Sequence, residues 1–321
     1  MDIEYLLLLQ NFRNGVGGFL APFTMWLSNF TIGFIPTAIM CMLYWSVDRK
    51  GGRKILLANS IDYLVNGFLK LTLCIYRPWI RDARIEPYGT SKTTATGYSF
   101  PSGHATVAGG TFGAVGVWLY KRGKKLMAII SFVFVLLVMF SRNYLGVHTP
   151  QDVFVGAASS FVVLFAASKI EDWTDKDPNR DKIVAVVGLL LCAALVAYYE
   201  LKSYPLAYQA DGSLLVDPAK MKIDSYSGLG FFAAFVVCRY FERRGFNFEA
   251  AMSWKDRFIV GTVALIPLYI WMSNISPLII HINGAFGLFT EYAVLAVYVL
   301  IAVPNVMRCV HDKNLLKEKV C

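Results

Sequence analysis

Long apolar stretches, bounded by short polar or charged segments, dominate the pattern of hydrophobic and polar positions along the chain. A helix needs about 20 apolar residues to cross the hydrocarbon core of a bilayer. Windows of about that length predict spans near 19–45, 54–76, 103–120, 126–142, 150–168, 183–200, 227–241, 258–275 and 285–307. The expected fold is therefore all-α, a polytopic transmembrane helical bundle of about nine spans.

The same pattern divides the chain into three expected parts. The stretch from Asp2 to Arg13 is too short to cross a bilayer and is charged at both ends, so residues 1–18 are expected to lie at the membrane interface. Residues 19–170 form the expected core, and residues 171–321 add C-terminal spans and an inner tail. The longest outer loop runs from Lys202 to Ser227; we interpret it as a solvated connector, with a lid as the alternative.

The composition argues against several classes of protein. Apolar residues make up 56% of the 321 residues and charged residues 17%, which is unlike a disordered chain or an ordinary soluble domain. The formal charge of +9 does not indicate a nucleic-acid partner, because the basic residues lie mostly in short loops between apolar runs. The cysteines show no paired spacing, so no disulfide framework is expected.

Basic residues concentrate in alternate loops, and this asymmetry predicts the orientation in the membrane. The basic loops lie at 49–54, 121–125, 169–182, 243–257 and 308–319. These loops are expected to face the cytoplasm, which places the N-terminus outside and the C-terminus inside. The lipid bilayer is thus an expected partner, the plasma membrane is the expected location, and an oligomer is left open.

Polar residues line one face of the second predicted span. Asn59, Asp62, Asn66, Lys70 and, at the outer end, Arg77 fall within a stripe roughly 80° wide at about 100° per residue. A charge at the bilayer centre costs about 2.5–3.5 kcal/mol on insertion scales. The stripe is therefore expected to face the bundle interior or a water-filled cleft. Lys70 and Arg77 lie two helical turns apart and can reach one outer point, and the proline after Arg77 is expected to end the helix.

The third predicted span begins with a signal for an anion site on the outer side. Ser102 is the expected N-cap, and Gly103 has no side chain to keep a ligand from the free backbone N–H groups. The N-terminus of a helix binds anions through these groups and through the helix dipole. Residues 102–104 are therefore candidates for contact with a phosphate.

The fifth predicted span begins in a similar way. Thr149 is the expected N-cap, Pro150 takes the first helical position and Asp152 the third. On that pattern alone Asp152 is a capping carboxylate that needs no catalytic role. His148 precedes this helix start, however, and Arg142 ends the fourth span on the same outer side. Ionisable groups at such positions favour a functional site.

Three segments, in order and with unbroken spacing, resemble the signature of the type-2 phosphatidic acid phosphatase superfamily: Lys70-x6-Arg77-Pro78, Pro101-Ser102-Gly103-His104 and Ser141-Arg142-x5-His148-x3-Asp152. This superfamily includes lipid phosphate phosphatases, glucose-6-phosphatase, sphingosine-1-phosphate phosphatases and the soluble vanadium haloperoxidases. The resemblance covers about residues 54–168. It implies an enzyme, a phosphoric ester hydrolase.

The resemblance also implies a role for each residue. His148 would be the nucleophile that forms a phosphohistidine, and Asp152 would orient its ring. His104 would protonate the leaving alkoxide and later activate water. The groups expected to hold the phosphate are Lys70, Arg77, Ser102, Gly103 and Arg142. No metal ion or other cofactor is expected, because the site sequence lacks a converging set of His, Cys and carboxylate ligands.

We therefore expect an integral membrane phosphatase that hydrolyses lipid phosphate monoesters or diphosphates without a metal, because the residues lie at the membrane rim where headgroups reside. Three alternatives share these residues: a lipid phosphotransferase, a phosphatase of a soluble sugar phosphate like glucose-6-phosphatase, and a non-catalytic phosphate or anion transporter. The pairing of His148 with Asp152 argues against the transporter, since anion binding does not need an imidazole held by a carboxylate.

Overall fold

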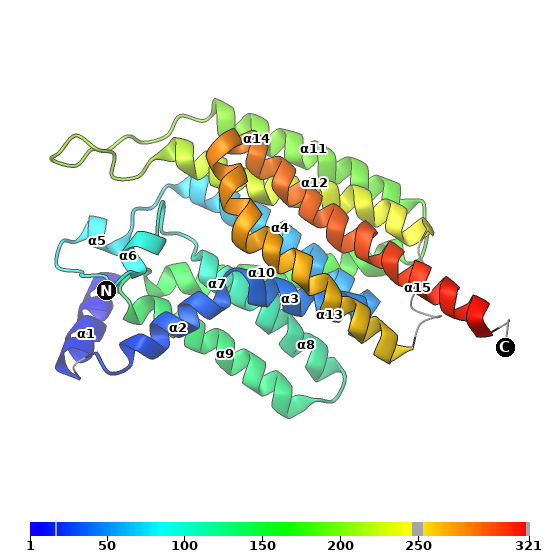
Figure 1. Ribbon diagram of the computed structural model, residues 1–321. Helices are drawn as coiled ribbons and strands as arrows, with labels where there is room; N and C mark the ends of the chain where they lie inside the picture. Colours follow the sequence, from blue (N-terminus) through cyan, green and yellow to red (C-terminus); the bar gives the residue numbers. More distant parts are fainter. Residues whose placement is uncertain (17, 246–252, 319–321) are drawn as a thin grey trace. The chain divides into compact units, whose positions relative to one another are not determined.

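The computed structural model describes residues 1–16, 18–245 and 253–318, and within them the regular structure is helical (Figure 1). The expected all-α class is confirmed: among these residues the one β-type pairing is an isolated bridge between Tyr208 and Leu214. The elements in chain order are α1 (Asp2–Gly15), α2 (Ala21–Thr31), α3 (Phe34–Met42), η1 (Leu43–Val47), α4 (Arg49–Leu73), α5 (Pro78–Arg81), α6 (Ser91–Thr94), α7 (Gly103–Val107), η2 (Ala108–Gly113), α8 (Ala114–Lys121), α9 (Lys125–Tyr144), α10 (Pro150–Thr174), α11 (Arg180–Leu201), α12 (Pro218–Gly245), α13 (Trp254–Ile270), η3 (Trp271–Ile275), α14 (Ser276–Val297), η4 (Tyr298–Ala302) and α15 (Val303–Glu318).

Six helical stretches of the described chain are long and apolar enough to cross a membrane, or seven if α2 and α3–η1, which meet at a bend of 49°, form one span. The expected count of about nine spans is thus not confirmed. The two remaining candidates are α4 and the stretch 103–121. Asp62 and Lys70, with their polar neighbours, lower the hydropathy of α4, and the π-helical segment η2 divides the stretch 103–121 into three short pieces.

The chain folds into two compact units. Unit 1 contains residues 1–36, 62–165 and 198–225, and unit 2 contains residues 37–61, 166–197 and 226–321. The predicted chemical motifs all lie in unit 1. Of the basic clusters predicted to face the cytoplasm, those at 49–54, 169–182 and 243–244 lie in unit 2, and the cluster at 121–125 lies in unit 1.

Close packing in unit 1 brings the N-terminal ends of α7 and α10 together. Helix α9 packs against α2, α7 and α8, and an apolar core joins Leu27, Ala105, Val138 and Val153. A Cβ at Gly156 would lie 2.6 Å from the Ser102 carbonyl oxygen, so glycine is required for the approach of α10 to the start of α7. The two predicted helix starts therefore meet.

The polar helix α4 ends earlier than the sequence predicts. It stops at Leu73, whereas the second span was expected to continue to about residue 76, just before Arg77. Cys74 has a φ of 50°, outside the helical region, and residues before a proline disfavour helical dihedrals. Lys202 Nζ lies 2.6 Å from the Thr72 carbonyl oxygen and also bonds the Leu71 carbonyl, so a lysine satisfies helix-end acceptors.

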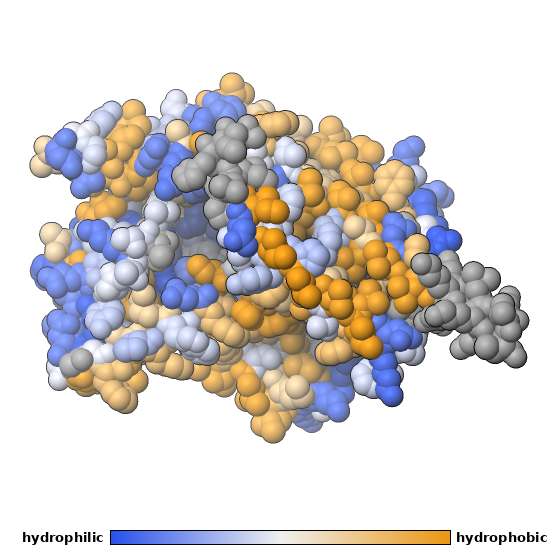
Figure 2. Space-filling view, viewed as in Figure 1, coloured by the Kyte–Doolittle hydropathy of each residue, from blue (hydrophilic) through white to orange (hydrophobic). Residues whose placement is uncertain are grey.

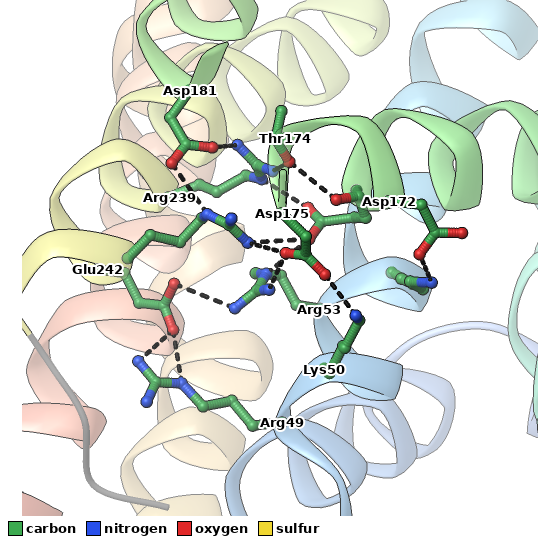
Figure 3. Close-up of polar contacts among 12 residues, drawn as sticks. Arg49, Lys50, Arg53, Asp172, Thr174, Asp175, Asp181, Arg239 and Glu242 are labelled. Carbon is green, nitrogen blue, oxygen red and sulfur yellow. Dashed lines mark hydrogen bonds and ion pairs between the residues drawn. The ribbon is translucent and has the colours of Figure 1, made fainter. Parts of the chain in front are cut away.

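Unit 2 holds a buried network of ion pairs among α4, α10, α11 and α12 (Figure 3). Glu171 is fully buried; its Oε1 lies 2.5 Å from Arg239 Nε and its Oε2 lies 2.8 Å from Arg53 Nε. Arg239 Nη1 also lies 2.7 Å from Asp181 Oδ1. Glu242 accepts hydrogen bonds from Arg49 Nε at 2.7 Å and from Tyr44 Oη at 2.9 Å. Arg49 and Arg53, two of the basic residues used to predict orientation, therefore have buried carboxylate partners.

Large apolar side chains face outward on the candidate membrane helices. On α13 they include Phe258, Ile259, Val263 and Ile266, each more than half exposed, and Figure 2 shows an orange band over this helix. Exposure of such a surface to water is unfavourable, whereas contact with lipid chains would bury it.

We predict that Glu171→Gln strongly destabilises the protein and that Asp172→Asn does not. The first change leaves buried arginines without their carboxylate and should cost about 3–5 kcal/mol. Asp172 is 53% exposed and pairs with Lys54, so its loss should cost less than about 1 kcal/mol. The thermal unfolding midpoint of each purified variant in the same detergent tests this, and equal midpoints for the two variants would contradict it.

Candidate active site

Asp152 orients the ring of His148 at the start of α10. His148 Nδ1 lies 3.3 Å from Asp152 Oδ2. The same oxygen accepts a hydrogen bond of 2.8 Å from the Thr149 backbone N–H and one of 2.5 Å from Ser99 Oγ. Asp152 is therefore a helix-capping carboxylate, as its sequence position allows, and it also contacts the imidazole.

Arg77 determines which nitrogen of His148 carries the proton. Arg77 Nη1 lies 2.8 Å from His148 Nε2. A guanidinium has no acceptor, so Nε2 must be the acceptor, and the proton of a neutral ring is then on Nδ1, facing Asp152. Burial, together with the positive charges of Arg77, Arg142 and Lys70, lowers the pKa of His148 well below its usual range. The ring is therefore neutral near pH 7, with a lone pair on Nε2.

Backbone carbonyls hold the guanidinium of Arg77 in place. Nη1 donates to the Val147 carbonyl oxygen at 3.0 Å, Nη2 to that of Thr96 at 3.0 Å, and Nε to that of Gly97 at 3.1 Å. The side chain is buried, and that burial lowers the pKa of Arg77 to about 10, so it stays charged near pH 7. The guanidinium is held by three neutral acceptors and the His148 ring, and among the residues that the structure describes no carboxylate bonds to it directly.

Arg142 has hydrogen-bonding groups left for a ligand. It is only 1% exposed, and its Nη1 donates to Ser28 Oγ. Its Nε and Nη2 have no hydrogen-bond partner within the described part of the chain. A buried charged donor without a partner is costly. This arrangement is that of an anion site whose anion supplies the missing acceptors.

Lys70 adds a third positive group. Its Nζ donates to the Tyr98 carbonyl oxygen at 2.9 Å and lies 3.5 Å from that of Ser99. It also interacts electrostatically with Arg77, Arg142 and Asp152. Three cations thus surround one carboxylate, and the unbalanced positive charge favours a multiply charged anion.

The start of α7 forms another side of the site. Ser102 caps the helix by accepting a hydrogen bond from the Ala105 N–H at 3.4 Å, and its own N–H donates to the Asp152 carbonyl oxygen at 2.9 Å. At Gly103 the nearest atom that an added Cβ would meet is Asn66 Oδ1, 4.0 Å away. Open space therefore lies in front of Gly103. His104 interacts electrostatically with both Arg142 and His148.

The structure thus brings together every site residue named from the sequence: Lys70, Arg77, Ser102, Gly103, His104, Arg142, His148 and Asp152. Sequence reasoning missed Ser99, which bonds Asp152, and Asn143, whose Nδ2 donates to the His148 carbonyl oxygen at 2.9 Å. Neither belongs to a periodic pattern, and Ser99 lies 53 residues from its partner. The one sequence signal for these two residues was their position next to the motifs along the chain.

Comparison with known proteins identifies relatives of this segment. Residues 51–176 match the model of the PAP2 superfamily. The chain is 31% identical over 127 residues to phosphatidylglycerophosphatase B of Bacillus subtilis, a match that covers 38% of this chain and 58% of the relative. It is 29% identical over 138 residues to undecaprenyl-diphosphatase of Sulfolobus acidocaldarius, covering 43% of this chain and 63% of the relative. The chain therefore spans less than two thirds of the length of either relative, and no solved structure matches.

We predict that Arg142→Met weakens the binding of inorganic phosphate. The methionine keeps apolar volume but removes the two unpartnered N–H groups, so affinity should fall about tenfold or more. Arg84→Gln is the matched control, because Arg84 is exposed and pairs with Asp82 and Glu4. Calorimetric titration with phosphate measures both variants, and an unchanged affinity in Arg142→Met would refute the assignment.

Proposed function

We propose that the protein is an integral membrane phosphatase that hydrolyses lipid phosphate monoesters or diphosphates through a phosphohistidine, because residues 51–176 match the model of the PAP2 superfamily. The observation that carries this proposal is the state of His148. Its ring is neutral, its Nε2 lone pair faces Arg77, and its Nδ1 faces Asp152. Such a ring is a nucleophile placed beside a cationic group that binds phosphate.

The first chemical step transfers the phosphoryl group to His148. Substrate oxygens take the free donors of Arg142 and attract the guanidinium of Arg77, which releases the lone pair on Nε2. Nε2 then forms the N–P bond as the P–O bond to the leaving group breaks. His104 gives its proton to the departing oxygen, and the positive charge that develops on His148 is stabilised by Asp152.

The second step returns His148 to its starting state. His104, now neutral, takes a proton from a water molecule as that water attacks phosphorus, and the N–P bond breaks. Inorganic phosphate leaves, and both imidazoles are as they were. Charge on the phosphoryl oxygens is balanced by Lys70, Arg77 and Arg142 and by the backbone N–H groups at the start of α7. We propose that these groups do this work without a metal ion.

The lengths of α4 and α10, and the ionisable residues near both ends of each, fit helices that cross a bilayer with the site at one membrane surface. Helix α4 has Arg49 at its start and Lys70 in its last turn, and α10 has Asp152 in its first turn and Glu171 near its end. Each helix of 25 residues is about 37 Å long, enough to cross a bilayer. We propose that α4 and the stretch 103–121 are spans as well, which makes nine, with the site at the extracytoplasmic rim of the plasma membrane, the N-terminus outside and the C-terminus in the cytoplasm.

We predict that His148→Ala abolishes phosphate release from lipid phosphates, because it removes the imidazole that we propose accepts the phosphoryl group. The assay uses a panel of lipid monophosphates and diphosphates, with glucose 6-phosphate as a soluble comparison. His311→Ala in α15 is the matched control and should keep the activity, and the wild type should stay active after chelator treatment. Turnover that persists in His148→Ala would exclude the nucleophile assignment.

We also predict a bell-shaped dependence of kcat on pH, because His148 must be neutral while His104 is protonated in the substrate complex. The lowered pKa of His148 means that its neutral form persists on acidification. The acid limb of kcat/KM, which reports the free enzyme, should therefore lie below the usual histidine value of about 6.5. A rate that is flat from about pH 5 to about pH 8 would count against the two opposed roles.

A further inference from the structure

A cavity of about 510 Å³ lies next to Arg77. Its volume is within the range of pockets that bind small ligands. One wall comes from residues 77–97 and the other from residues 209–221, and both belong to unit 1. The second wall lies outside residues 51–176, the segment that matches the family model. We call it the Lys92–Lys220 cavity, after the two lysines in its lining.

The second wall is an ordered part of unit 1. The Gln209 N–H donates to the Ser213 carbonyl oxygen at 2.7 Å, and the Leu215 N–H to that of Ala207 at 2.8 Å, so this segment forms a hairpin. Met221 is buried, and a Cβ at Gly97 would lie 1.8 Å from Met221 Sδ. Only glycine allows this close approach. The connector that we interpreted as solvated therefore packs on the segment that holds Arg77.

The cavity lies next to the phosphoryl site, because Arg77 lines the cavity and also contacts His148. The carbonyl groups of Thr96 and Gly97 accept hydrogen bonds from Arg77, and both residues also line the cavity. Trp79, another lining residue, lies under the guanidinium at 5.8 Å from its ring centroid. A group in the cavity is thus close to the cation that binds His148.

The lining carries a net positive charge. Arg77, Lys92 and Lys220 supply three cations and Asp217 one carboxylate, a balance of three minus one, or plus two. Asp217 Oδ1 is occupied, because it accepts the N–H groups of Ala219 at 2.9 Å and Lys220 at 3.4 Å at the start of α12. Neither lysine ammonium has a carboxylate within ion-pair distance in the described chain. Two exposed ammonium groups are thus available to an anion.

We propose that the Lys92–Lys220 cavity binds a second phosphate group of the substrate while the first is held for transfer to His148. The preferred substrates are then lipids with two phosphates, either joined as a diphosphate or separated by a short polar linker. This proposal rests on the proposed function, because it takes Arg77 as a ligand of the reacting phosphoryl group. The residues outside the family segment would in this way select the substrate.

The test compares substrates with one and two phosphates on the same lipid. The purified full chain in detergent is assayed with a prenyl monophosphate, the matching prenyl diphosphate and a lipid with two separated phosphates. The double variant Lys92→Gln/Lys220→Gln should lower kcat/KM about five- to tenfold for at least one substrate with two phosphates. The monophosphate should change less than about twofold, and the substrate that loses most identifies the spacing that the cavity fits.

Lys222→Gln is the matched control. Lys222 lies two residues from Lys220 in α12 but pairs with Glu200 and does not line the cavity. It should leave all three substrates within about twofold of the wild type. Equal losses for one and two phosphates in the double variant, or no loss at all, would overturn the proposal.

A binding measurement separates this proposal from the proposed function. Methylenediphosphonate and inorganic phosphate are titrated into the His148→Ala protein, which needs no turnover. The diphosphonate should bind about tenfold more tightly than phosphate, and the two lysine changes should remove this advantage. That result supports the cavity assignment even if the wild type releases no phosphate. A wild type that releases no phosphate would refute only the proposed function. Equal affinities for the two anions would refute the cavity assignment even in an active enzyme.

Discussion

The hydrogen bond between Arg77 Nη1 and His148 Nε2 constrains the rest of the site. It assigns the lone pair to Nε2 and the proton to Nδ1, so Asp152 must accept on the other side of the ring. The carbonyl groups of Val147, Thr96 and Gly97 fix Arg77. All three residues lie in loops, so their carbonyl oxygens are not used within a helix and can accept from the guanidinium.

The same arrangement leaves positive charge without an internal partner. In unit 2, by contrast, the buried arginines are paired with carboxylates. Arg53 and Arg239 share Glu171, and Asp181 adds a second carboxylate. In unit 1 the buried Arg142 keeps two free donors, and Lys70 and Arg77 bond mainly to neutral oxygens. A fold selected for stability alone would pair these groups. The contrast between the units indicates that the unit 1 cations serve an anionic ligand whose oxygens accept their hydrogen bonds, and binding of such a ligand would stabilise the folded protein.

Much of the site could be predicted because its residues stand at points that local rules recognise. Ser102 begins a helix, Arg142 ends one, and Lys70 is a charged residue in an apolar stretch, so each can be recognised from the sequence without a fold. Ser99 and Asn143 were not predicted, because their roles depend on tertiary contacts that no local sequence pattern encodes. The end of α4 was predicted too late for a similar reason. Pro78 predicts that the helix stops near residue 77, but the positive φ of Cys74 and the contact of Lys202 with the helix end place the stop earlier. The predicted count of nine spans exceeds the six or seven that the described helices support, because polar residues lower the hydropathy of α4 and η2 divides the stretch 103–121.

The connector after α11 shows how a segment without a motif can still contribute to the site. Its composition, with Pro205, Gly212 and Pro218, is typical of a solvated loop. The fold nevertheless anchors it at both ends in unit 1, through Lys202 on the last turn of α4 and Met221 against Gly97. Residues 209–221 of this anchored connector line the Lys92–Lys220 cavity next to Arg77. In our proposals, the segment that matches the family model supplies the reacting groups, and residues beyond it supply a wall for the rest of the substrate.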